Sequence, residues 1–268
     1  MNVHMVVREE ATMDDATVQE IVIDFPEAGD LLLKLAVGPG SLTMRKGSGG
    51  PWVSGTYRDP SRSIPCKFRV DGGTAEIAQD RKIPKSFKLM PKFDLQLGDA
   101  RPFRIKIEAG ANELIDCDFA GVPVSGFDGG FGAGKIRIDQ SEPNSTPMER
   151  FKLSNGATDL TLVNLANLNA ERIEIEGGAA MMRIDFGGTL QRDCRAKISA
   201  GVAAVEVHIP STVAAKIITH TSLGDLNVGD GFTTREGGFW TQAALDGTGP
   251  VLSLEASSAV GSLKLRTS

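Results

Sequence analysis

One short sequence pattern recurs along this chain and limits its possible folds more than any other feature. Each copy has an apolar–polar alternation, a stretch rich in glycine and alanine, and a second alternation, as in "EIEGGAAMMRIDF" at 174–186. Between 114 and 226 the first apolar residues after these stretches are 22, 24, 22, 23 and 21 residues apart. Regular spacing of this length indicates a stack of similar units, each burying its apolar face against its neighbours. Those residues are Leu114, Ile136, Leu160, Met182, Val205 and Leu226.

The alternation within each unit is typical of β-strands. Ile173 and Ile175 precede the small residues of one unit, and Met182 and Ile184 follow them. A period of two places such side chains on one face of a strand, whereas a helix needs apolar residues three and four apart. We therefore predict an all-β solenoid, similar to a β-helix, with coils of about 22 residues stacked at the usual strand spacing of about 4.8 Å.

The Gly-Ala stretches are predicted to be turns that join two strands of about four to six residues in each coil. Glycine tolerates positive φ and leaves room for the backbone of the neighbouring coil. The unit at Leu114 contains "ELIDCDF", which has one residue too many for clean alternation, and a β-bulge is expected there.

The N-terminal third is less regular. Apolar anchors at Leu42, Ile77 and Leu114 are 35 and 37 residues apart, and Leu263 follows Leu226 by 37, which indicates insertions in these units. The segment "DRKIPKSFKLMPKF" at 80–93 breaks the pattern with two prolines and four lysines. We predict an irregular N-terminal β-module over 1–93 and a regular stack, continuous with it, over 94–268.

Composition narrows the partners and the compartment. The net charge of -5 argues against nucleic acid and anionic lipid, which attract clustered cations. Three isolated cysteines without a CxxC pair suit a reducing compartment, and no apolar window reaches the length of a membrane span. Without a signal-like N-terminal segment the expected location is cytoplasmic. Association with the cell envelope is the alternative if an N-terminal anchor has been removed.

The sequence resembles a known family over roughly 20–268. The matching text is "LLLKLAVGPGSLTMRKG", the segment "FDLQLGDARPFRIKIEAGANELIDCDFAGVPVSGFDGGFGAGKIRIDQSEPN" and the repeats with Gly-Ala turns. These resemble the bacterial toast-rack family, which is related to the C-terminal domain of LiaF-like cell-wall stress regulators and to β-helical candidate adhesins. The resemblance implies a stacked all-β architecture, usually in envelope-associated proteins, with no established enzymatic activity.

The segment "GGFGAGKI" at 129–136 satisfies the spacing G-x-x-x-x-G-K of a phosphate-binding loop. Ile136 stands where such a loop needs Ser or Thr for Mg²⁺, and a strand rather than a helix is expected next. A structural turn is therefore the preferred interpretation.

A ladder of polar residues is expected near the ends of the coils. It comprises Asp118, Asp139, Asp185 and His208, with Asn164 interrupting it. Stacked carboxylates can bind Ca²⁺ or supply the acid and base of a polysaccharide-active enzyme, but Asp also satisfies turn backbones. Turn capping is the preferred alternative, and the three histidines are too scattered for a zinc site. We expect no catalytic centre, no metal and no cofactor.

Other side chains suggest a contact surface. The lysine cluster with its interleaved aromatics can touch an acidic polymer, although a solvated linker is the simpler alternative. Each tryptophan fits either a plug over a coil end or a sugar-stacking platform. The last strand is expected to leave an open edge, partly protected by charge. The residues are Lys82, Lys85, Lys88, Lys92, Trp52, Trp240, Lys264 and Arg266.

Three functions remain open. The preferred one is a non-catalytic interaction or scaffold protein, with a protein partner or self-association, related to bacterial cell-envelope organisation or stress response. The second is a polysaccharide-binding or carbohydrate-active protein. The third is a structural protein that self-assembles through its terminal strands.

Overall fold

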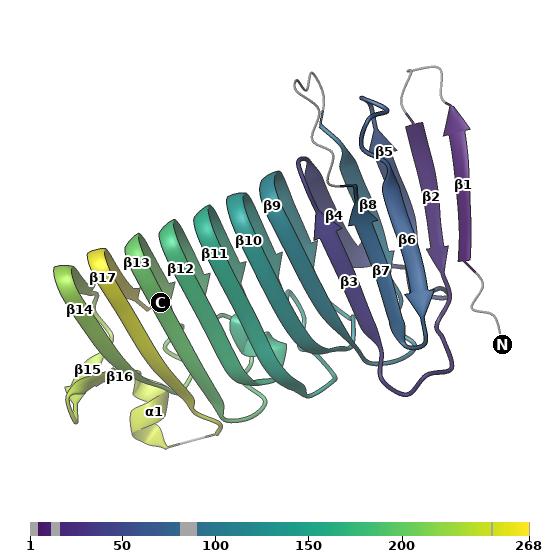
Figure 1. Cartoon of the computed structure of the whole chain (residues 1–268). Helices are drawn as coiled ribbons and strands as arrows, with labels where there is room; N and C mark the ends of the chain where they lie inside the picture. The colour runs from purple at the N-terminus through teal and green to yellow at the C-terminus, as the bar shows by residue number, and fades with distance from the viewer. Residues whose placement is uncertain (1–4, 12–16, 81–89, 248, 268) are drawn as a thin grey trace.

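The computed structural model describes residues 5–11, 17–80, 90–247 and 249–267, and these form one connected β-sheet (Figure 1). Seven long strands of 14–16 residues make up the regular part of the stack. Each runs up one side, bends at its small residues and returns on the other side. They are β9 (Phe103–Asp118), β10 (Val124–Asp139), β11 (Met148–Val163), β12 (Ala170–Asp185), β13 (Cys194–His208), β14 (Ala215–Val228) and β17 (Leu252–Arg266).

The prediction that each coil consists of two short strands joined by a turn was wrong, because each regular coil is a single long strand. Parallel pairing between β12 and β13 continues from Arg172 through the bend at Gly177–Ala180 to Asp185. The small residues therefore bend a strand without ending it, because they let neighbouring backbones stay close enough to pair. Each of these long coils is one strand with two arms. Backbone pairing covers both arms, and between β12 and β13 it covers the bend as well.

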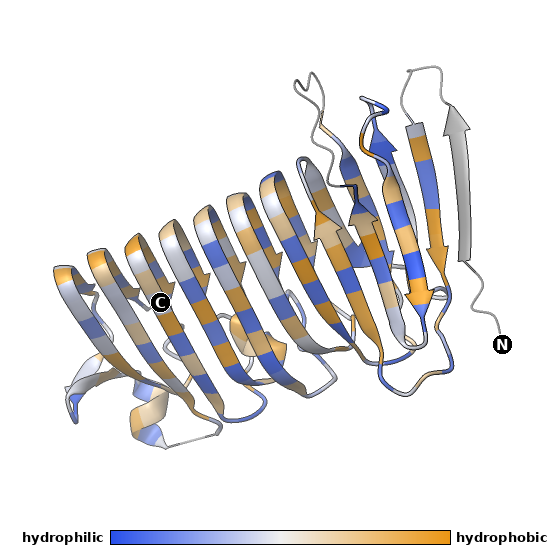
Figure 2. Ribbon diagram, viewed as in Figure 1, coloured by the Kyte–Doolittle hydropathy of each residue, from blue (hydrophilic) through white to orange (hydrophobic). Residues whose placement is uncertain are grey.

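The core fills the space between the two arms. In β12 the side chains of Ile173 and Ile175 on the first arm and of Met182 and Ile184 on the second are fully buried. Figure 2 shows the same alternation of apolar and polar bands on successive strands. The predicted all-β stack and its period-two core are confirmed.

The expected bulge at Leu114 is also confirmed. Leu114 is exposed, whereas Ile115 is buried and pairs with Ile136 of the next strand. Pairing shifts by one residue between Ala133 and Lys135. The additional residue of β9 thus lies at the bend, and alternation resumes in phase with the core.

The N-terminal third continues the stack with two coils that are split at the bend. β3 and β4 pair in parallel with the two arms of β9, and β7 and β8 pair with β3 and β4. Antiparallel strands follow on both sides, in the order β8–β5–β2–β1 and β7–β6. The bounds are β1 (Met5–Ala11), β2 (Thr17–Ile23), β3 (Leu32–Val37), β4 (Ser41–Lys46), β5 (Val53–Asp59), β6 (Cys66–Asp71), β7 (Thr74–Gln79) and β8 (Lys92–Leu97).

The predicted division between 1–93 and 94–268 falls inside β8, whose partners continue on both sides of residue 93. No break in the sheet marks that position. The division into two domains stays a prediction.

The chain order changes at the C-terminal end of the stack. β17 lies between β13 and β14 and pairs in parallel with both, so β14 is the last coil (Figure 1). The long spacing between Leu226 and Leu263 accommodates an inserted hairpin and a short helix. These are β15 (Thr233–Arg235), β16 (Gly238–Trp240) and α1 (Gln242–Asp246); a 3-10 helix, η1 (Leu165–Leu168), follows β11.

This arrangement corrects the expectation that Lys264 and Arg266 protect an open edge. Both residues are in β17, which has a strand on each side. The Arg266 guanidinium instead binds Glu206 of β13, with Nε 2.5 Å from Oε1. The last strand in the sequence is not the last in space, because the chain leaves β14 through the hairpin and returns one position inward.

The close approach at the bends predicts different effects of two glycine substitutions. Gly261 has a φ of 128°, and an added Cβ would lie 2.0 Å from the Ala203 carbonyl oxygen. We expect Gly261→Ala to lower the free energy of unfolding by about 2 kcal/mol or more. Around Gly130 of β10 an added Cβ meets no atom within 4 Å, so Gly130→Ala should change stability by less than about 0.5 kcal/mol. Urea denaturation of the two variants measures both values, and equal losses would contradict the bend geometry.

Candidate functional site

The predicted polar ladder lies where the second arms of the strands end. Asp118 of β9 is the pairing partner of Asp139 on β10, and Asp185 of β12 is the partner of His208 on β13. The structure thus brings these four residues to one edge of the stack. They form two pairs, Asp118 with Asp139 and Asp185 with His208, and the end of β11 lies between the pairs.

Asn164 joins the two pairs, although its place in the sequence indicated an interruption. Its side-chain Nδ2 donates to Asp139 Oδ1 at 2.8 Å, and its backbone N–H donates to Asp185 Oδ2 at 3.2 Å. Asp185 Oδ1 lies 2.6 Å from His208 Nδ1, and Arg137 donates to Asp139 Oδ2 at 2.6 Å. Asn164 adopts a left-handed conformation, with φ 59°, which directs both donors towards the neighbouring coils.

The Asp118 carboxylate also accepts hydrogen bonds from neighbouring turns. It accepts hydrogen bonds from the Ala120 N–H at 3.0 Å and from the Ser141 hydroxyl at 2.9 Å. Within the described ranges, no group of three or more His, Cys, Asp or Glu side chains could hold a metal ion. The hydrogen bonds support the capping alternative, because the carboxylates bind the backbone and side chains of adjacent turns.

A second polar ladder, of buried asparagines, was missed in the sequence. Asn144 Nδ2 donates to the Val124 carbonyl oxygen at 2.8 Å, Asn167 Nδ2 to that of Gln140 at 3.0 Å, and Asn169 Nδ2 to that of Asn144 at 3.1 Å. These amides donate to backbone carbonyl groups at the loops that join successive coils. The signal available was the cluster "NLANLN" at 164–169, since Asn favours both turns and left-handed backbone.

The segment 129–136, which has the spacing of a phosphate-binding loop, is part of the β-sheet. The segment lies inside β10, and its pairing with β11 continues through it up to Asp139. No helix follows to bind a phosphate at its N-terminus. The interpretation as a structural segment is supported, although it is a bent strand rather than a separate turn.

The three cysteines are free thiols in the core. Burial raises the pKa of Cys66 and of Cys194 to about 12, and it raises the pKa of Cys117 as well. A thiol reacts as the thiolate, so these groups are poor nucleophiles at neutral pH.

The proposed contact residues do not form one surface. Trp52 is not part of a contact surface, because its ring is fully buried and packs against Phe25 and Phe103 at centroid distances of 6.1 and 5.7 Å; this burial agrees with the hydrophobic-plug alternative. Lys92 is on β8, with Nζ 4.0 Å from Asp94 Oδ2. Lys82, Lys85 and Lys88 lie outside the described residues.

Trp240 is at the opposite end of the molecule, on the β15–β16 hairpin. Lys216 Nζ lies 4.3 Å from the ring centroid and the Arg235 guanidinium carbon 4.8 Å from it. The hairpin is attached through Thr241, whose buried hydroxyl accepts from the Ala215 N–H at 2.9 Å and donates to the Val213 carbonyl oxygen at 2.7 Å.

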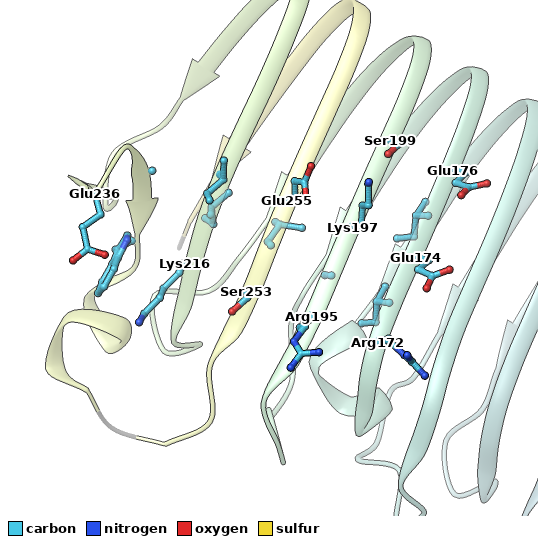
Figure 3. A pocket seen from close by; sticks show the side chains of 18 residues that line it. Arg172, Glu174, Glu176, Arg195, Lys197, Ser199, Lys216, Glu236, Ser253 and Glu255 are labelled. Carbon is cyan, nitrogen blue, oxygen red and sulfur yellow. The ribbon is translucent and has the colours of Figure 1, made fainter.

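A groove of about 700 Å³ lies beside this hairpin. The first arms of β12, β13, β17 and β14 form its floor, and the hairpin lies at its β14 end (Figure 3). Charged side chains of both signs line it in rows across the strands. We call it the hairpin groove, and its charged residues are Arg172, Glu174, Glu176, Arg195, Lys197, Lys216, Glu236 and Glu255.

The fold and these sites can now be set beside known proteins. The family model for the N-terminal domain of toast_rack, DUF2154, matches residues 12–149 and, in a second overlapping match, 143–208. The chain belongs to the toast-rack family. This confirms the family expected from the repeat and from the segment that begins "FDLQLGDA".

Two solved structures align over nearly the whole toast-rack chain. One is a candidate cell adhesion protein from Clostridium sporogenes ATCC 15579, with 14% identity, coverage of 98% of this chain and 100% of the other, and a TM-score of 0.49. The other is a candidate adhesin from Bacteroides fragilis NCTC 9343, with 11% identity, coverage of 98% and 97%, and a TM-score of 0.34. No curated protein matches the chain. No helix in the described part of the chain is both long and apolar enough to cross a bilayer.

The bridging role of Asn164 predicts a loss of stability when only its side chain is removed. Asn164→Gly keeps a residue that tolerates the left-handed backbone but removes the hydrogen bond to Asp139. We expect a loss of about 1.5–3 kcal/mol in the free energy of unfolding, as for a bond to a charged acceptor. Glu236→Gly is the matched control, because Glu236 is left-handed (φ 52°) and its ion pair with Arg235 is exposed, so the loss should stay below about 0.5 kcal/mol. An equal response of the two variants in urea denaturation would refute the bridge.

The raised thiol pKa values predict a stability that falls in alkaline solution. An unfolded thiol ionises above about pH 9.0, whereas buried Cys66 stays neutral up to about 12. Its stabilising effect is therefore complete below pH 9 and is lost as the pH rises towards 12, by roughly 1 kcal/mol at pH 10. Between pH 8 and 10, Cys66→Ala should lose less stability than the wild type in urea titrations. Parallel curves for the two proteins would show that Cys66 is not buried as described.

Proposed function

We propose that this chain is a non-catalytic interaction or scaffold protein that binds a protein partner by strand addition along the open edge of β14. Self-association through that edge is one form of the proposal. A role in bacterial cell-envelope organisation or stress response is also proposed, and membership of the toast-rack family supports it.

The observation that carries the proposal is the incomplete pairing of β14. One side of β14 pairs with β17 from Ala215 to Val228. On the other side β16 pairs only with Lys216 and Ile217. Among the described strands nothing else pairs with that side, so the backbone groups of residues 218–228 face outward. Such a row is a template for another strand.

Three large apolar side chains along this edge are exposed. Ile218 is 51%, Leu223 72% and Leu226 40% exposed. Leu226 pairs with buried Leu263, so it occupies a core position that becomes exposed because the stack ends there. A further coil placed against β14 would cover this side chain as each coil covers the one before it.

The open end differs from the edge strand β6 at the other end of the stack. Among the described strands β6 pairs only with β7, and one of its faces carries exposed Lys67, Arg69 and Asp71. Charged side chains discourage pairing between edges. The segment 218–228 has no Lys or Arg and only one acid, Asp225. Of these two edges, β14 is the one that lacks protection by charge.

The proposal predicts association that depends on Leu223. Light scattering across a concentration series should show growth in mass for the wild type and a monomer for Leu223→Lys. Val202→Lys is the matched control, because Val202 is in the same row across the strands, is 61% exposed, and lies on β13, which is paired on both sides. This variant should associate like the wild type.

A second measurement, capture from a lysate, tests for a partner protein that is different from this chain. If the wild type is monomeric, immobilised wild-type and Leu223→Lys chains are compared for capture from a lysate of the source cells, with Val202→Lys beside them. A protein retained by the wild type and by Val202→Lys, but lost with Leu223→Lys, supports strand addition at β14. A monomer whose captured proteins are identical for all three chains would overturn it.

A further inference from the structure

A row of cations crosses the strands, beginning at Arg150 outside the hairpin groove and entering the groove at Arg172. Arg150, Arg172 and Arg195 are direct partners on the neighbouring strands β11, β12 and β13. Like charges opposite one another destabilise a sheet, and violations of such local rules tend to mark functional sites. Ser253 and Lys216 continue the row towards the hairpin.

These cations are only partly neutralised by neighbouring acids. Arg150 Nε lies 3.8 Å from Oε2 of Glu174, an acid of the groove. Arg172 reaches outside it, to Glu149 Oε1 at 3.1 Å, and its Nε is shielded from water without a hydrogen-bond partner among the described residues. The side chains of Arg195 and Lys197 make no hydrogen bond or ion pair with any residue that the structure describes. Donors of this kind, held on a rigid sheet, are suited to an external anion.

The next row alternates in sign. Glu174, Lys197 and Glu255 are successive partners on β12, β13 and β17, and Ile218 of β14 completes the row. Figure 3 shows these side chains projecting from adjacent strands above the row of Arg172 and Arg195. Acceptors and donors therefore alternate at the strand spacing of about 4.8 Å. A hydroxyl group both donates and accepts, so a chain of hydroxyls can use both kinds of side chain.

The hairpin closes the β14 end of the row. Trp240 lies between Lys216 and Arg235, and these contacts restrict the motion of both cations. Side chains that are already restrained lose less entropy when a ligand binds.

We infer that the hairpin groove binds an acidic saccharide chain that lies across the strands. Its carboxylates bind Arg172, Arg195 and Lys216, and its hydroxyls bind Glu174, Lys197 and Glu255. A polyanion without hydroxyl groups along its chain, such as DNA, fits less well, because its backbone offers no hydroxyl donor to Glu174 and Glu255 and the protein is itself acidic. This site adjoins the β14 edge used in the proposed function and shares Ile218 with it, but Arg172 and Arg195 lie on β12 and β13, away from that edge.

The test uses hexagalacturonate as the probe and the full chain as the protein. Isothermal titration calorimetry at low and at physiological ionic strength gives its affinity. We expect the hexamer to bind, and its methyl ester, which keeps the sugar but lacks the charge, to bind at least tenfold more weakly. Hexaglutamate and a six-residue oligothymidylate should also bind at least tenfold more weakly.

Substitutions then assign the site. Arg172→Gln together with Arg195→Gln should weaken binding of the hexamer at least tenfold without altering the melting temperature. Arg183→Gln is the matched control, because Arg183 is an exposed arginine on the second arm of β12, outside the hairpin groove, and it should stay within twofold of the wild type.

Three outcomes would overturn the inference. The first is no binding of the hexamer at millimolar concentration. The second is equal binding of hexaglutamate or of the oligothymidylate, which would make the site a general polyanion site. The third is an affinity unchanged in the double variant. None of these substitutions touches residues 218–228, so the outcome is independent of association through β14.

Discussion

Parallel backbone pairing on both arms of the long strands is the constraint on which the rest of this structure depends. Neighbouring coils stay in register from the first arm to the second, so each side chain has a fixed partner on the next strand. The bend residues must then be small, as at Gly261, where the carbonyl oxygen of Ala203 occupies the space of a Cβ. The core, the polar ladders and the outer rows of charge all repeat because this pairing repeats them.

The same constraint separates structural polar groups from candidate binding groups. Asp139, Asn164 and Asp185 bind one another or adjacent turns, so their polarity is satisfied inside the fold. Arg195 and Lys197 project from the middle of an outer face, where the repeat needs no charge. Two surfaces of the described chain keep groups available to a partner: the edge of β14, with its unpaired backbone groups, and the hairpin groove, with its cations. Both lie at the C-terminal end of the stack, where the inserted hairpin interrupts the repeat.

Much of this could be predicted from local sequence. Period-two alternation identified the core side chains Met182 and Ile184, and the additional residue near Leu114 identified the bulge. The exchange of β14 and β17 could not be predicted, because both carry the same pattern and only the path of the intervening hairpin decides their order. For the same reason Lys264 and Arg266 were wrongly expected at an edge. The row of Arg172 and Arg195 is visible only once the register between strands is known.

Hydrogen exchange of backbone amides tests the central claim, that β17 is internal and β14 is the open end of the stack. The measurement uses a protein concentration at which light scattering shows a monomer. Peptides from 252–266 should be protected as strongly as those from β13, whereas peptides from 218–228 should exchange much faster. Strong protection of 218–228 in the monomer together with rapid exchange of 252–266 would contradict the strand order and, with it, the proposed contact edge.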